Sequence, residues 1–298
     1  MDLSVIFSAQ LLASVLVLAS LYALVAIGLN LVYGTMRLLN VAHGELVMLG
    51  GYVAYWAFAQ WAISPLLAAL VAMVIAAAVG ALLYIAIIRR LFRSPSLLAR
   101  IESNSLLVFF GISIIIQNVT SLAFTADSRG YSYLDDVIEI GGARIAANRL
   151  ATLAVAGLAS LACALFFRYA RSGMAMRAII QQRDAAALVG IDVDRINVQV
   201  FALGFALAAL AGALISMSQQ ISPFMGFPFT VSGFVIIILG GLGNLTGSIF
   251  GSLILAAVEV YGVTLISPSF RSILVYGVFI AALLLRPQGL LGRSIRAR

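Results

Sequence analysis

Long uncharged runs separated by short polar segments dominate the pattern along the chain. A helix needs about 20 mainly apolar residues to span the hydrocarbon core. The runs that reach or approach this length cover residues 3–36, 46–88, 103–126, 150–167, 196–258 and 272–285. Gln60, Ser64 and Pro65 interrupt the second run, which predicts two helices joined by a tight turn. We therefore expect an all-α polytopic membrane protein of about eight hydrophobic helices, with residues 1–298 forming a single transmembrane domain.

The longest run also contains breaks, at residues 219–223 and at the glycine-rich residues 240–244. Between residues 230 and 285 the pattern permits two readings. The chain either crosses once and adds a re-entrant hairpin, or makes three short crossings.

The composition excludes several classes of function. Hydrophobic residues make up 63% of the chain and charged residues 10%, against roughly 25% charged residues in soluble domains. All 18 basic residues are arginine, so the chain cannot supply the lysine of a P-loop or of a Schiff base. With one cysteine, Cys163, and one histidine, His43, we expect no internal disulfide and no metal site. The arginines lie in short loops rather than on a solvated face, which argues against nucleic-acid binding.

The loop charges predict an orientation, because cytoplasmic loops carry excess arginine and lysine. Residues 89–102 hold four arginines and one glutamate, residues 168–197 five arginines and three aspartates, and residues 286–298 four arginines. Residues 127–149 hold three arginines and four acidic residues. We expect the first three segments in the cytoplasm and residues 127–149 outside. The N-terminus then lies outside and the C-terminus inside.

Two glycine-punctuated segments interrupt apolar runs, one near each end of the chain. The first is residues 40–45, which continue into Gly50 and Gly51, and the second is residues 240–247, followed by Gly251. Interrupted helices at corresponding positions of two halves indicate a transport pathway built from an internal repeat. Close packing between helices is the alternative explanation for the glycines, and the two are compatible.

The segment 168–197 predicts a short amphipathic helix. Ser172 is a candidate N-cap for a helix from about Met174 to Val189, and Gly190 can end it in the left-handed conformation. Such a helix either docks into a groove of a partner protein or lies in the lipid headgroup layer.

A resemblance adds to this interpretation. Residues 177–196, RAIIQQRDAAALVGIDVDRI, resemble the cytoplasmic loop of ABC importer permeases. GLNLVYG (28–34), NVAHGE (40–45), GGLGN (240–244) and LRPQG (285–289) resemble the shorter of two permeases in branched-chain amino-acid importers. Urea and amide importers share these motifs, and Asp184 stands where family members often have glutamate. The resemblance assigns contact with the ATPase to the coupling helix, for which the candidates are Ser172, Arg177, Arg183, Asp184, Ala185, Ala186, Gly190 and Asp192.

The resemblance also implies the partners and the location. The partners are two ATPase subunits, an external substrate-binding protein, and a second homologous permease or a second copy of this chain. This chain itself would lie in a bacterial inner membrane. ATP and Mg²⁺ would bind the ATPase subunits, so we expect no cofactor on this chain. Residues 127–149 and 218–230 would then face the binding protein.

Polar residues inside the membrane are costly and usually face a cavity or a partner. The candidates for the translocation pathway are Asn30, Asn40, His43, Glu45, Gln117, Asn118, Asn244, Thr246 and Glu259. We expect His43 and Glu45 to straddle a helix break, and Asn30 to hold helices together. Gln117 and Asn118 either bond neighbouring helices or contact substrate. Glu259 either lines a cavity or marks a helix end at the interface.

These features favour a permease subunit that moves branched-chain amino acids by alternating access, driven by ATP on partner subunits. A permease for urea or short amides is one alternative. The other is a secondary transporter in which Glu259 and His43 carry a coupling proton. A membrane enzyme finds no support, since no paired carboxylates, metal-ligand spacing or nucleophile motif falls in one region.

Overall fold

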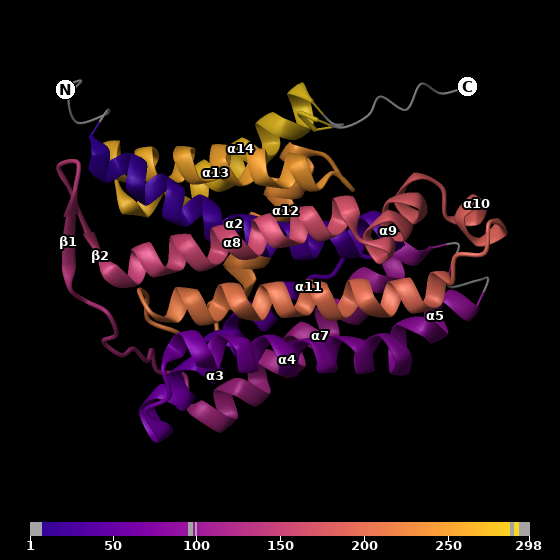
Figure 1. Ribbon diagram of the computed structural model, residues 1–298, viewed down its shortest axis with the longest axis horizontal. Coiled ribbons are helices and arrows are strands. Elements are labelled where there is room, and N and C mark those ends of the chain that lie inside the picture. The colour runs from indigo at the N-terminus through magenta and orange to yellow at the C-terminus, as the bar shows by residue number, and fades with distance from the viewer. Residues whose placement is uncertain (1–7, 95–97, 99, 287–288, 292–298) are drawn as a thin grey trace.

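The computed structural model describes residues 8–94, 98, 100–286 and 289–291. Most helices run along one common direction, and a β-hairpin lies at one end of the bundle (Figure 1). We call this end the hairpin end, and the opposite one, where two short helices lie, the α9–α10 end. Helix α2 begins at the hairpin end, where the backbone N–H of Arg144 donates to the side chain of Gln10.

The helices follow the apolar runs of the sequence. They are α2 (Ala9–Met36), α3 (His43–Trp61), α4 (Pro65–Leu83), the π-helix η1 (Tyr84–Ile88), α5 (Arg89–Arg93), α7 (Ile101–Phe124), α8 (Ala147–Tyr169), α9 (Arg171–Gln181), α10 (Arg183–Leu188), α11 (Val193–Ser216), α12 (Gly226–Gly240), α13 (Leu245–Leu265), the 3₁₀ turn η2 (Pro268–Phe270) and α14 (Arg271–Leu285).

Seven helical stretches in the described chain are long and apolar enough to cross a membrane. They are Ala9–Met36, Pro65–Phe92, Ile101–Phe124, Ala147–Tyr169, Val193–Ser216, Leu245–Leu265 and Pro268–Leu285. Helix α12 is apolar but has only 15 residues, about 22 Å at 1.5 Å per residue, which is short of the roughly 30 Å hydrocarbon core. The chain is therefore a multi-pass, all-α membrane protein, as the sequence predicts.

Side-chain caps and proline set several helix starts at the positions that the sequence marks. Asp192 accepts from the backbone N–H of Arg195 at the start of α11, and Asn244 accepts from that of Gly247 at the start of α13. Pro65 opens α4, where its missing N–H would have no helical partner. Each cap of this kind stabilises its helix by about 1 kcal/mol.

Helices α2 and α11 form the centre of the bundle, because they are the most buried of the seven spanning stretches. They touch at Gly28 and Gly204, where a Cβ on Gly28 would come within 2.7 Å of the carbonyl oxygen of Gly204. Helix α4 packs along α11 and α13 packs along α2. The absence of side chains at this contact is what allows the two central backbones to approach so closely.

The same contacts reveal an internal repeat. Helices α2, α3 and α4 correspond to α11, α12 and α13, and the two units run in opposite directions, since α2 begins at the hairpin end and α11 at the α9–α10 end. Helix α3 packs on α11 as α12 packs on α2, and α3 and α12 pack on each other. This antiparallel arrangement is the inverted repeat known from many transporter folds.

The two glycine-punctuated segments do not occupy corresponding positions of the two units, and the break of the second unit is the one expected at residues 219–223. It lies between Ser216 and Gly226, before α12, whereas residues 240–244 form the turn that ends α12 and leads into α13. Gly241 and Gly243 have φ of 107° and 79°, a conformation that favours glycine and stops a helix. A glycine cluster marks a tight turn as readily as an interrupted helix, and the sequence alone does not separate the two.

The hairpin of β1 (Val137–Ile140) and β2 (Ala143–Ala146) is not among the predicted elements. Its strands pair antiparallel through a two-residue turn, in which Gly141 and Gly142 have φ of 57° and 84°. Two glycines between short strands with alternating apolar residues are the usual signal for such a turn. The hairpin lies within the loop 127–149. Pro287 and Gln288 of the LRPQG motif lie outside the described residues, as do the arginines that follow them.

Candidate functional site

The first turns of α3 and α12, the helices that follow the breaks of the two units, meet inside the bundle. The backbone N–H of Gly44 donates to Thr230 Oγ1 at 2.8 Å, and the Thr230 hydroxyl donates to the carbonyl oxygen of Val41 at 2.9 Å. A Cβ on Gly44 would collide with the carbonyl oxygen of Gly226. We call residues 40–45 and 226–230 the helix junction.

The junction lies well inside the bundle rather than at a helix end. His43 Nε2 lies 3.1 Å from the carbonyl oxygen of Val25, and Val25 precedes Met36, the last residue of α2, by 11 residues. At 1.5 Å per residue this places the start of α3 about 16 Å from the end of α2. Residues 37–42 therefore return into the protein without forming a helix.

Buried polar groups without partners gather at the junction. Asn40, His43 and Glu45 are all 0% exposed. Glu45 Oε1 accepts a hydrogen bond from Ser113 Oγ of α7 at 2.9 Å. Among the described residues, nothing bonds to Glu45 Oε2, to His43 Nδ1 or to either polar atom of the Asn40 side chain. Leaving such a group unpaired costs about 1–3 kcal/mol, so this cluster marks a site that serves something other than stability.

His43 and Glu45 do not straddle the break, contrary to expectation. Both lie in the first turn of α3, because the N–H of His43 bonds the carbonyl of Asn40 and that of Glu45 bonds the carbonyl of Ala42. The helix can therefore start directly at the histidine. The two side chains point to different helices, one to α2 and the other to α7, as residues two apart on a helix must.

Three other pathway candidates lie at the α9–α10 end instead. Asn30 Nδ2 donates to Ser248 Oγ at 2.7 Å and to the Asn244 carbonyl at 3.0 Å, and Asn30 Oδ1 accepts from the Gly243 N–H at 2.6 Å. The Asn244 side chain caps α13 and donates to the carbonyl of Leu291. Thr246 is exposed. Asn30 thus joins α2 to the turn between α12 and α13.

Glu259 joins three helices. Its Oε2 accepts from the Tyr22 hydroxyl of α2 at 2.5 Å, and its Oε1 lies 2.5 Å from Nε of Arg271 at the start of α14. The Glu259 side chain is 5% exposed and that of Arg271 is 48% exposed. This pairing offsets the cost of burying the Glu259 carboxylate. Glu259 therefore holds α13 to α2 and to α14.

The last two pathway candidates lie on α7. Gln117 is half-buried, and Asn118 is exposed and bonds only the carbonyl of Ile114 in its own helix. Among the described residues, neither side chain bonds to the junction, which α7 reaches through Ser113.

The segment 168–197 forms two helices where one was predicted. Helix α9 ends at Gln181 and α10 begins at Arg183, because Gln182 is extended, with φ of −160° and ψ of 105°. Ser172 is not a cap: it lies inside the first turn of α9, and Ala170 occupies the cap position. Gly190 has φ of 88°, so the left-handed end is as expected.

The side chains of this segment divide into inward and outward groups. The Arg183 guanidinium stacks over Phe92 of α5 at 4.3 Å, and Ala186 is buried. Leu188 and Val189 are 89% and 78% exposed. An apolar pair this exposed on a charged loop is typical of a protein-binding surface. Of the remaining candidates, Arg177 bonds the carbonyl of Arg168, Ala185 is half-buried and Asp184 is exposed.

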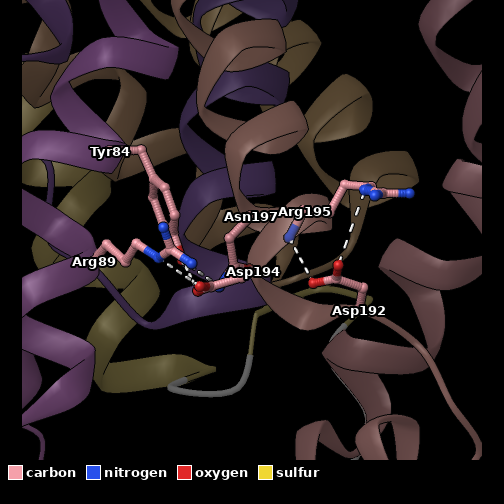
Figure 2. Close-up of polar contacts among 6 residues, drawn as sticks. All are labelled: Tyr84, Arg89, Asp192, Asp194, Arg195 and Asn197. Atoms are coloured by element: carbon pink, nitrogen blue, oxygen red, sulfur yellow. Dashed lines mark hydrogen bonds and ion pairs between the residues drawn. The ribbon is translucent and has the colours of Figure 1, made fainter.

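A polar cluster connects the end of this segment to the α4–α11 pair (Figure 2). Asp194, in the first turn of α11, accepts from the Tyr84 hydroxyl at 2.9 Å and from Arg89 Nε at 2.7 Å. Asn197 donates to the same hydroxyl at 3.1 Å. Tyr84 is fully buried and begins the π-helix between α4 and α5, a distortion frequent at functional sites. A shift of α10 would reach α11 through Asp192, the cap that precedes this cluster.

Comparison with known proteins connects this geometry to transport. The family described as the branched-chain amino acid transport system permease component matches residues 11–283. This chain belongs to that family.

Curated permeases align with most of this chain. It is 34% identical to the high-affinity branched-chain amino acid transport system permease protein LivH of Salmonella typhimurium over 93% of this chain and 92% of the relative. It is 30% identical to the permease protein BraD of Pseudomonas aeruginosa over 95% of each. It is 24% identical to the ribose import permease protein RbsC of Escherichia coli over 84% of this chain and 76% of the relative. No solved structure matches the chain.

Several residues that complete the sites of this permease were not among the sequence candidates. Ser113 and Thr230 are hydroxyls in apolar helices, and single hydroxyls of this kind are common in membrane spans. Gly226 follows Pro223, and both residue types are typical of loops, so the sequence does not indicate that a helix starts there. Tyr84 and Arg271, the partners of Asp194 and Glu259, had no local signal, because each pairs with a residue in another helix.

Proposed function

We propose that this permease carries branched-chain amino acids into a bacterial cell as the membrane subunit of an ABC importer. The observation that carries the proposal is the 34% identity to LivH over 93% of the chain. The helix junction supports it, because two interrupted helices of an inverted repeat are where transporters bind and release substrate. Separation of α3 from α12 is the movement that would open the path.

ATP and Mg²⁺ act on separate ATPase subunits in this proposal. The chain lacks lysine, which a P-loop requires, and its own role is transport rather than catalysis. The exposed Leu188 and Val189 form the contact with an ATPase subunit, and the excess of arginine in residues 168–197 favours a cytoplasmic position. The C-terminus then lies in the cytoplasm and the N-terminus outside.

The hairpin end faces an external binding protein in the same proposal. The loops 127–149 and 217–225 lie together there, since the backbones of Arg129 and Ile221 exchange two hydrogen bonds of 2.8 Å. A second permease, either a homologue or another copy of this chain, completes the membrane part.

The test uses the complete importer, reconstituted in liposomes with its ATPase and binding-protein partners. We expect ATP-dependent uptake of labelled leucine that excess isoleucine or valine suppresses and excess urea does not. Uptake driven by a proton gradient without ATP, or suppressed by urea alone, would contradict the proposal.

A pair of variants tests the coupling surface in the same liposomes. Leu188→Glu places a charge on the exposed apolar pair, and should leave a folded permease that no longer couples ATP hydrolysis to uptake. Leu188→Met keeps the size and the apolar character, and should retain coupling. Equal coupling in both variants would show that the ATPase contact lies elsewhere.

A further inference from the structure

One oxygen of a buried carboxylate is held at the helix junction and the other is free. Glu45 is 0% exposed and its Oε1 is fixed by Ser113. Its Oε2 has no hydrogen-bond partner among the described residues. A Cβ built on Gly226 would come within 2.5 Å of this oxygen. The free oxygen of Glu45 therefore faces the first residue of α12.

The helix junction contains both hydrogen-bond acceptors and hydrogen-bond donors. Glu45 Oε2 and the Asn40 amide oxygen are acceptors, while the Asn40 amide nitrogen and the N–H groups of the first two residues of α12 are donors. The first three N–H groups of α3 are already hydrogen-bonded. No lysine or arginine occurs in residues 40–45 or 226–230, so Glu45 is the one formal charge of the junction. A ligand with a cationic and an anionic group side by side matches this set, whereas an anion would be repelled and a neutral amide would leave the charge unpaired.

The junction is closed in this structure, yet little holds it closed. The first turns of α3 and α12 touch through the backbones of Gly44 and Gly226, so no side chains interlock at that contact. The hydrogen bond from the Gly44 N–H to Thr230 Oγ1 links the two turns directly. Movement of α12 away from α3 would uncover the Glu45 side chain, whose free oxygen faces Gly226.

We infer that Glu45 Oε2 binds the α-ammonium group of the transported amino acid, with Asn40 and the N-terminus of α12 receiving its carboxylate. This inference rests on the proposed function and adds the chemical class of the substrate. It requires a zwitterion, which excludes urea and carboxylic acids that lack an amino group. Glu45 would thus select for amino acids at the junction, and the apolar side chain would lie between the helices.

The test replaces Glu45 by glutamine in the complete reconstituted importer. Loss of a charge-assisted hydrogen bond to the ammonium group should lower leucine uptake by about 10-fold or more, while ATP hydrolysis and the thermal unfolding profile stay close to wild type. The control is Glu102→Gln, the same chemical change on an exposed glutamate at the start of α7, which should leave uptake unchanged. Wild-type uptake by the Glu45→Gln importer would overturn the inference.

A labelling experiment decides the matter if Glu45→Gln does not fold. Ser113→Cys is combined with Cys163→Ala, which removes the one native cysteine of the chain. A membrane-permeant thiol reagent should modify Cys at position 113 during ATP turnover, and saturating leucine should slow that modification at least threefold. Modification at the same rate with and without leucine would overturn the inference. If the wild-type importer moves no branched-chain amino acid, the proposed function itself fails. If the wild type transports leucine but the Glu45→Gln variant transports it equally well, or leucine does not protect position 113, the inference alone fails.

Discussion

Asn30 is the side chain whose contribution to stability can be worked out most fully. It is 0% exposed and makes three hydrogen bonds of 2.6–3.0 Å to the turn and helix that follow α12. Asn30→Ala removes all three and leaves the Gly243 N–H without its acceptor. Interhelical hydrogen bonds in membranes average about 0.6 kcal/mol and those in soluble proteins reach about 1.5 kcal/mol. The expected loss is therefore about 2–4 kcal/mol of unfolding free energy.

The measurement is thermal unfolding of the purified permease in detergent. A loss of this size should lower Tm by about 3–6 °C in a protein of this length. The matched control is Asn118→Ala, since Asn118 is exposed and bonds only the carbonyl of Ile114 in its own helix. Its effect should stay within about 0.5 kcal/mol of wild type.

A comparison of the two variants refutes or supports the reasoning directly. If Asn30→Ala unfolds within about 1 °C of Asn118→Ala, then the contacts between α2 and the α12–α13 turn do not stabilise the bundle. The assignment of Asn30 to helix packing would be withdrawn in that case.

Two further predictions concern contacts between helices. Gly212→Val should prevent folding, because a Cβ at Gly212 would overlap the backbone of α3; Gly157→Val is the control, since nothing lies within 4 Å of a Cβ there. Size-exclusion chromatography should show a single folded peak for the control alone, and two equal profiles would contradict the close approach of α3 and α11. Arg271→Gln should lower the unfolding free energy by about 1–3 kcal/mol, because it leaves Glu259 buried without its cation. Thermal unfolding checks this, and a Tm equal to that of wild type would show that the ion pair does not hold α14.

Hydrophobic runs and punctuation residues in the sequence located the long helices well. The turn at Ser64 and Pro65 and the left-handed Gly190 lie where local rules place them. These features depend on a few neighbouring residues, and local backbone preferences are enough to set them.

Features that depend on contacts between distant segments could not be predicted from the sequence. The meeting of Gly44 with Gly226 joins residues 182 positions apart, and no local pattern relates them. Gly241 and Gly243 suggested an interrupted helix but form a tight turn, because both structures favour the same residue type. Gln182 breaks the amphipathic segment although glutamine is a good helix former, so packing rather than propensity sets that break.

The central claim is that substrate passes where α3 meets α12, and a reversible cross-link tests it most directly. Val41→Cys and Thr230→Cys, combined with Cys163→Ala, place two thiols on residues whose carbonyl and hydroxyl groups are already hydrogen-bonded. Oxidation should stop ATP-driven leucine uptake by the reconstituted importer, and reduction should restore it, while Thr230→Cys alone responds to neither. Uptake by the oxidised, fully cross-linked double variant at the rate of its reduced form would contradict the account.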